Sequence, residues 1–180
     1  MIAILLATAA PAAAPPAVPA CPIERAVYRP RPAPEFTAGF ARQDRRKIRA
    51  SDLVFWLKTP KRTYWFSFGS PNGYGGTYIA PDIDPRAAAQ MDDDEERAAT
   101  ARATTAMEPL ALQFDAFEAD LDAYDVPPHS EQPAPAYIFA RGLGPALTYE
   151  WTGLAGGDPT SVQESMPIGM FELAGCGESP

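Results

Sequence analysis

The sequence predicts an α+β fold that is predominantly antiparallel β-sheet, with a hairpin at residues 53–68 at its centre and one Ala-rich acidic helix near residues 86–105. Three observations support this prediction. Short runs of β-branched and aromatic residues recur along the chain, separated by turn-forming residues. The 21 prolines among 180 residues disfavour a mainly helical chain. Only the segment after Asp84-Pro85 is long, rich in alanine and free of internal proline.

Residues 1–20 have the character of a signal peptide. They carry no charge, and their apolar run over residues 2–10 is too short to span a bilayer. Small residues before Cys21 provide a cleavage site, although no basic residue precedes the apolar run. The alternative is a disordered Ala/Pro tail on a cytosolic protein. We expect an extracytoplasmic protein, periplasmic or secreted, in which residues 21–180 form a single globular domain.

The two cysteines, Cys21 and Cys176, lie near the two ends of the expected domain. In an oxidising compartment such a pair predicts a disulfide, which here would close almost the whole domain into one loop. A lipid anchor on Cys21 is the alternative, because residues 18–21 loosely resemble a lipobox. It would leave Cys176 as a free thiol, so we favour the disulfide. No Cys-x-x-Cys motif or zinc-ligand spacing occurs, and we expect no metal and no cofactor.

The first half of the chain predicts a series of short strands. Residues 22–35 form an extended Pro-rich entry segment with an edge strand at 26–28, and residues 36–40 form a second strand. The hairpin pairs residues 53–58 with 63–68 across a four-residue loop. With Lys58 opposite Thr63, Leu57, Phe55 and Leu53 face Tyr64, Phe66 and Phe68 on the core side.

The glycine-rich loop at 70–76 leads into an expected strand at 77–79. It lacks the glycine spacing and the lysine of a nucleotide loop, which argues against nucleotide binding. Asp84 and Pro85 then have the pattern of an N-cap followed by proline in the first helical position. The helix that follows has little apolar stripe, so we expect it to be exposed.

The second half of the chain is less clear. Residues 107–124 fit helical spacing and strand alternation, and we favour a strand at 110–117 followed by an acidic loop. Further strands are predicted at 136–140, 147–151 and 169–173, with a turn at 142–145 between the first two.

The net charge of −8 argues against nucleic acid as a partner. The charge is unevenly distributed: residues 24–65 contain 11 basic and four acidic residues, whereas residues 66–180 contain four basic and 19 acidic residues. We expect the two stretches to lie side by side and neutralise each other, with a docking surface as the alternative.

The hairpin register also places Trp56 opposite Trp65 on the face away from the core. An exposed tryptophan pair would form a stacking platform for a sugar ring, whereas a buried pair contributes apolar packing. Packing against another layer is the favoured interpretation. Trp56 and Trp65 are nevertheless the candidate ligand-binding residues of the chain.

The remaining candidates for chemistry have simpler interpretations. The acidic run at 92–96 lacks the spacing of a calcium loop, and the acids between Asp115 and Asp125 are typical of a solvated loop. His129 is the single histidine, and no Gly-x-Ser-x-Gly motif accompanies it. We assign no catalytic residue and no metal ligand.

We therefore expect an exported protein with a non-enzymatic binding or structural role in a bacterial-type envelope or the secreted space. Its partner would be an envelope protein or a glycan. One alternative is a carboxylate-dependent glycan hydrolase of the cell envelope. The other is a small-ligand carrier, which would need an internal apolar cavity. Because residues 21–180 contain no further apolar segment of membrane-spanning length, we do not expect an integral membrane protein.

Overall fold

The computed structural model describes residues 21–43, 50–71, 76–105 and 112–180. The predicted signal peptide at 1–20 lies outside the described residues. So do most of the basic residues between 42 and 49 and the central part of the glycine-rich loop at 70–76.

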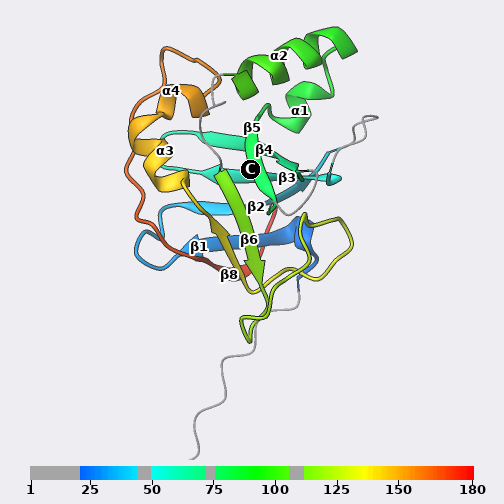
Figure 1. The fold of residues 1–180 in the computed structure, drawn as a ribbon, viewed down its shortest axis with the longest axis vertical. Coiled ribbons are helices and arrows are strands. Elements are labelled where there is room, and N and C mark those ends of the chain that lie inside the picture. Colours follow the sequence, from blue (N-terminus) through cyan, green and yellow to red (C-terminus); the bar gives the residue numbers. More distant parts are fainter. Residues whose placement is uncertain (1–20, 44–49, 72–75, 106–111) are drawn as a thin grey trace, which may run out of the picture.

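Eight antiparallel strands form a closed barrel in which each strand pairs with its neighbour in the chain (Figure 1). The last strand then pairs with the first, so the barrel leaves no edge strand. The strands are β1 (Ala26–Pro30), β2 (Thr37–Arg42), β3 (Leu53–Lys58), β4 (Thr63–Gly69), β5 (Tyr78–Asp82), β6 (Leu112–Phe117), β7 (Tyr137–Ala140) and β8 (Phe171–Cys176).

The fold is thus mostly β and antiparallel, as predicted, but barrel closure was not expected. The prediction placed the hairpin at the centre of the sheet and gave residues 26–28 as an edge strand. In the structure β1 lies between β2 and β8, and its pairing with β8 extends from Ala26–Cys176 to Pro30–Phe171. A right-handed sheet twist carried through eight strands allows the two outer strands to meet in this way.

The register of the hairpin is confirmed over five residue pairs. The β3–β4 ladder pairs Lys58 with Thr63 and continues to Val54 opposite Ser67. The backbone N–H of Thr59 donates to the carbonyl oxygen of Arg62 at 2.8 Å and closes the predicted four-residue loop. Strand predictions at 26–28, 36–40, 77–79, 136–140 and 169–173 are also confirmed within a few residues. The strand predicted at 110–117 is confirmed over 112–117, and its first two residues lie outside the described part of the chain.

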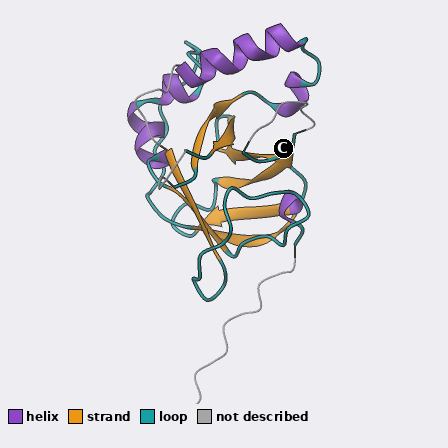
Figure 2. Ribbon diagram, turned by 45° about the vertical axis from the view of Figure 1, so that its right-hand side comes forward, coloured by secondary structure: helices purple, strands orange, loops and turns teal. Residues whose placement is uncertain are grey.

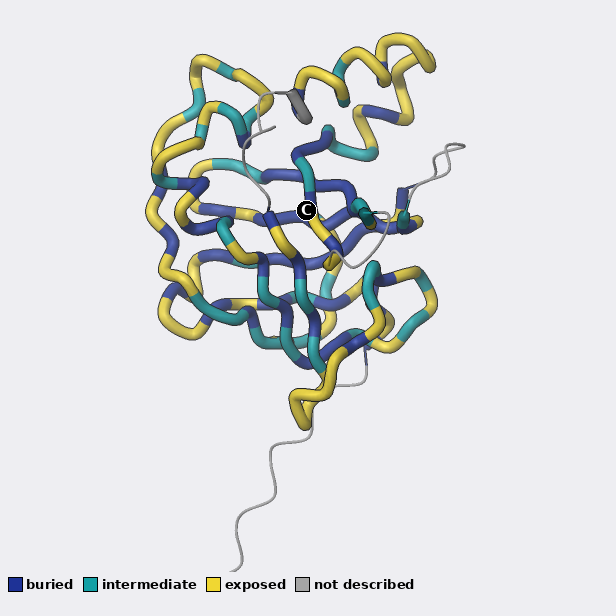
Figure 3. The backbone as a smooth tube through the Cα atoms, in the orientation of Figure 1, coloured by how far each residue is buried: buried dark blue, intermediate teal, exposed yellow. Residues whose placement is uncertain are grey.

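Aromatic side chains fill the inside of the barrel. Phe40, Phe55, Phe68 and Phe114 are buried and in mutual ring contact, with centroid separations from 5.0 Å to 6.2 Å. Successive strand residues point to opposite faces, so this cluster selects every second residue of its strands. The tube in Figure 3 shows the strands largely buried and the connecting segments largely exposed.

The predicted helix at 86–105 is two helices, α1 (Pro85–Ala88) and α2 (Asp93–Thr105). The predicted cap is confirmed, because Asp84 Oδ1 accepts a hydrogen bond from the N–H of Arg86 and proline occupies the first turn. The helical conformation is interrupted between α1 and α2. Asp92 directly precedes α2, and its Oδ1 accepts hydrogen bonds from the N–H groups of Asp94 and Glu95.

The strand predicted at 147–151 is wrong. Residues 142–145 are not a simple turn either, because they lead into α3 (Leu143–Tyr149), which is followed by α4 (Trp151–Leu154). Leu143, Ala146 and Leu147 are fully buried and have helical spacing. Burial of this face therefore outweighs the β-propensity of the aromatic residues nearby. The four α-helices gather over the top and left of the barrel in Figure 2, and a short 3-10 helix, Ile23–Arg25, precedes β1.

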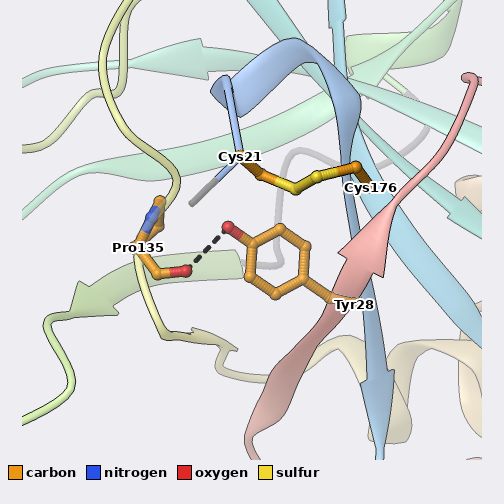
Figure 4. Close-up of a disulfide and its surroundings, with 4 residues drawn as sticks. All are labelled: Cys21, Tyr28, Pro135 and Cys176. Carbon is orange, nitrogen blue, oxygen red and sulfur yellow. Dashed lines mark hydrogen bonds between the residues drawn. A yellow bond between two sulfur atoms is a disulfide. The ribbon is translucent and has the colours of Figure 1, made fainter. Parts of the chain in front are cut away.

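The predicted Cys21–Cys176 disulfide is present, and it joins the segment before β1 to the end of β8 with a Cα–Cα distance of 5.8 Å (Figure 4). With Cys21 in this bond, its sulfur is not free to carry a lipid. The buried Tyr28 lies beside the bridge and donates a hydrogen bond to the carbonyl oxygen of Pro135 at 2.9 Å. The β6–β7 connection is thereby tied to the same region as both ends of the sheet.

Basic residues of the first stretch contact acidic residues of the second, as expected. Arg31 pairs with Glu172 at 2.7 Å, and Arg62 pairs with Asp158 at 3.3 Å. Arg42 lies 3.7 Å from Glu131. These side chains are partly or fully exposed, so each pair contributes little to stability. Within the described part of the chain, no helix combines the length and apolar character needed to cross a membrane.

Removal of the disulfide is expected to destabilise the protein strongly. Cross-linking residues 155 positions apart restricts the unfolded chain, and the chain-entropy account gives an upper figure of about 4–5 kcal/mol. The Cys21→Ser/Cys176→Ser variant should therefore lose several kcal/mol in the free energy of unfolding measured with urea. Reducing the native protein should have the same effect, and an unchanged unfolding midpoint in both samples would contradict it.

Candidate functional site

Trp56 and Trp65 face each other across β3 and β4, on the outer side of the barrel. Both are buried, with 3% and 7% of their surface exposed, and they form a small outer cluster with Ala41, Val54 and Val27. The favoured interpretation of the pair as packing residues is confirmed in this respect. An open stacking platform is not what the structure contains.

Trp56 packs closely against the neighbouring strand β2, because the residue opposite it there is a glycine without a side chain. Gly39 pairs with Trp56, and a Cβ atom built at Gly39 would lie 2.6 Å from Cζ2 of the indole and 2.5 Å from the carbonyl oxygen of Ala26. The indole therefore lies close against Gly39 of β2. Its Nε1 is buried and has no acceptor among the described residues. Trp56 is thus a structural residue, enclosed on the outer face.

Trp65 lies instead between two hollows on the outer surface. The first, which we call the α2 hollow, has a volume of about 540 Å³ and lies between β4, α2 and the end of α4. The second, the α1 hollow, has a volume of about 430 Å³ and is lined by β2, α1 and the segment before β1. Trp65 and Arg86 line both hollows, so we refer to the two together as the Trp65 groove.

The insertion between β5 and β6 builds one wall of this groove. Asp82 ends β5, and its Oδ1 accepts hydrogen bonds from the N–H of Ile83 at 2.8 Å and from the hydroxyl of Thr100 at 3.3 Å. The second bond fixes α2 beside the sheet. α2 has few buried residues, in accordance with the exposed helix that was predicted (Figure 3). The α2 residues that line the hollow are Ala99, Arg102 and Ala103, and the two small alanines leave space above Trp65.

Three arginines line the α2 hollow: Arg62, Arg86 and Arg102. Guanidinium groups favour an anionic ligand. Arg62 pairs with Asp158, and Arg86 pairs with Asp84 at 3.2 Å. Arg102 forms no ion pair with any described residue. Sequence reasoning missed all three, because only the folded chain brings the hairpin loop, the α1 cap and α2 together. The weak apolar stripe of α2 was the one available signal that this helix borders a polar space.

Arg62 is fixed from two sides. Its guanidinium carbon lies 5.2 Å from the ring centroid of Tyr64, a cation–π distance. On the other side, Asp158 also accepts hydrogen bonds from Thr160, which together with Arg62 hold the pKa of Asp158 below its ordinary value. Burial and the nearby carboxylate of Glu164 raise the pKa of Tyr64 to about 12, although Arg62 opposes this shift.

Acidic residues also line the Trp65 groove: Asp82 and Asp84 in the α2 hollow, and Glu24 and Glu96 in the α1 hollow. Glycoside hydrolysis needs one carboxyl group on each side of the bond that breaks. Asp82 and Asp84 lie two residues apart in one wall, and their oxygens accept the hydrogen bonds that fix α1 and α2. Both side chains therefore have structural partners.

A serine, a histidine and an aspartate also meet elsewhere, at the connection between β6 and β7. The hydroxyl and N–H of Ser130 donate to Asp52, and Nδ1 of His129 lies 3.5 Å from Asp52 Oδ1. Burial would raise the pKa of Asp52, but these contacts outweigh it and lower that pKa. In a catalytic triad the histidine lies between the other two residues. Here the aspartate does, so the arrangement is a loop contact, and His129 is exposed as predicted.

The acidic clusters of the sequence have structural explanations. The first turn of α2 contains Asp93, Asp94, Glu95 and Glu96. Their negative charges interact favourably with the positive end of the helix dipole. Of the acids between Asp115 and Asp125, Asp115 lies in β6 instead of the predicted loop, 3.8 Å from Arg141, and the others lie on an exposed loop after β6. Among the described residues, no group of three or more potential ligands is arranged to hold a metal ion.

Comparison with protein-family models, with curated protein sequences and with solved structures finds no match to this chain.

A substitution at Gly39 tests whether Trp56 is held by close packing. Gly39→Ala places a methyl group against the indole and a backbone oxygen, so we expect a loss of about 1–3 kcal/mol in the free energy of unfolding. Gly169→Ala is the control, because a Cβ there meets nothing within 4 Å. Equal urea midpoints for the two variants would show that Trp56 is loosely held.

The buried tyrosines predict a loss of stability at alkaline pH. Burial and nearby acids raise the pKa of Tyr64 and of Tyr124 to about 12, and burial also raises that of Tyr28. Unfolded tyrosine ionises near pH 10, so these groups contribute stability that is fully present below about pH 10. That contribution is lost as the pH rises to about 12.

The corresponding measurement is the free energy of unfolding in urea at pH 9 and at pH 11.5. The native protein should lose stability between them, and the Tyr64→Phe/Tyr124→Phe variant should lose less. Tyr149→Phe, at an exposed position, is the matched control. An identical pH dependence in all three proteins would contradict the assignment.

Proposed function

We propose that this chain is an exported binding protein, without enzymatic activity, that binds a component of the cell envelope or secreted space through the Trp65 groove. Export is supported by the apolar residues 1–20 and by the Cys21–Cys176 disulfide, a bond characteristic of oxidising compartments. Its site of action would be periplasmic or extracellular.

The observation that carries the proposal is the meeting of two hollows at one tryptophan. Trp65 is 7% exposed and borders both hollows, and arginines line the hollows beside it. Binding sites commonly combine an aromatic anchor with a few charged groups that fix orientation. Trp65 and the arginines therefore form the binding residues of the proposed function, and Trp56 supports Trp65 from the neighbouring strand.

Two features support binding over the other functions considered. Asp82 and Asp84, the two acids of the α2 hollow, lie in one wall and hold α1 and α2, which is not the arrangement that a glycan hydrolase needs. The described barrel interior is packed with phenylalanine rings in mutual contact, and these rings occupy the place where a carrier would hold its ligand.

The proposal is tested by photo-crosslinking in the cells that produce the protein. A photoreactive amino acid replaces Arg86 in the groove or Arg141 outside it, two side chains with similar exposed fractions, 66% and 63%. We expect a processed, exported protein that forms one discrete adduct from position 86 and none from position 141. The adduct mass distinguishes a protein partner from a glycan. Equal adducts at both positions, none at position 86, or retention in the cytosol would contradict the proposal.

A further inference from the structure

The end of the described chain runs along the Trp65 groove. After β8, the N–H of Gly177 donates to the carbonyl oxygen of Arg25 at 2.7 Å and continues the pairing of β8 with β1. Ser179 then lines the α1 hollow, and Pro180 lines the α2 hollow. The C label in Figure 1 lies beside the labels of β4 and β5. We call residues 177–180 the strap.

The strap is weakly attached beyond its first residue. Within the described residues, the bond from Gly177 is the one hydrogen bond made by residues 177–180. Glu178 and Ser179 are exposed, and Pro180 is half-buried. An extended segment with so few bonds can leave the groove at low cost, while the β1–β8 ladder before it stays intact.

The composition of the strap matches the composition of the groove. Pro180 shares the α2 hollow with Trp65, and extended proline-containing segments dock on aromatic surfaces because proline restricts their conformation beforehand. Glu178 is exposed and directly precedes Ser179, which lines the α1 hollow. Asp84 and Asp158 already pair with Arg86 and Arg62, whereas Arg102 forms no ion pair with a described residue. Arg102 is therefore the group placed to receive a carboxylate from outside.

We infer that the ligand of the Trp65 groove is an extended peptide segment of another protein, with a carboxylate beside a proline, which takes the place of residues 178–180. This inference rests on the proposed binding function and names its ligand class. Arg102 binds the carboxylate, Trp65 contacts the proline, and the strap competes with the ligand. A peptide is favoured over a glycan because Ser179 and Pro180 of the chain itself already line the two hollows.

Displacing the strap should uncover the site. A Cβ atom at Gly177 would lie 2.9 Å from Cγ2 of Val27, so Gly177→Val should push the strap off the surface. The probe is a fluorescein-labelled heptapeptide, Ala-Gly-Ser-Gly-Glu-Ser-Pro, which reproduces residues 174–180 with serine in place of cysteine. Its binding is followed by fluorescence anisotropy.

We expect saturable binding of the probe to Gly177→Val and about tenfold weaker binding to the native protein, where the tethered strap competes at an effective concentration in the millimolar range. Gly169→Ala should behave as the native protein. Adding Arg102→Gln to Gly177→Val should weaken binding about tenfold, while adding Arg141→Gln should not. A probe with glutamine in place of glutamate should bind equally well with and without the Arg102→Gln substitution, because the paired carboxylate is gone.

A second variant keeps the test valid if Gly177→Val does not fold, as judged by near-ultraviolet circular dichroism. Glu178→Gln/Pro180→Gly weakens the strap without touching Gly177 and should raise the affinity for the probe several-fold. Equal binding to strap variants and native protein, or binding insensitive to Arg102→Gln, would overturn the inference. So would binding of a chito-oligosaccharide in place of the peptide, although crosslinking at position 86 would then still support the proposed function.

Discussion

The pairing of β8 with β1 is the constraint on which the rest of this structure depends. It joins residues from the two ends of the described chain and converts a row of eight strands into a barrel without edges. Unpaired strand edges invite association with other chains, and closure removes them. The disulfide between Cys21 and Cys176 lies at this seam and makes the closure covalent. A reduced chain would have to hold the same non-local contact by backbone hydrogen bonds and side-chain packing alone.

Closure also separates an inside from an outside and so determines where binding can occur. In small barrels the interior is either filled by side chains or left open for one small ligand. Here phenylalanine rings fill it, and the alternate residues of β3 and β4 place both tryptophans outside. The helices inserted between β5 and β6 then turn part of that outer face into a groove. Ligand binding is thereby separated from the core, and the groove can change without repacking the barrel.

The sequence-based predictions succeeded where neighbouring residues determine the outcome. Alternating aromatic residues set the hairpin register, and Asp84 with Pro85 sets a helix start. Barrel closure was missed because β1 and β8 are short, contain proline or glycine, and carry no local signal of their distant partner. The strand predicted at 147–151 was wrong because burial of Leu143 and Leu147 decided in favour of a helix. The groove arginines could not be grouped, since α2 approaches Trp65 only in the folded chain.

The β1–β8 seam and the Trp65 groove meet at consecutive residues. The residues that stabilise the barrel are therefore distinct from those that control access to the groove. Cys176 ends β8 and belongs to the closure, whereas Gly177 begins the strap that lies over the groove. The covalent bond fixes where the strap starts, so the strap stays close to Trp65 even when it is released. Beyond Gly177 the attachment is weak, and the strap can leave without loss of a β1–β8 pair. Competition between strap and ligand therefore requires no unfolding of the barrel.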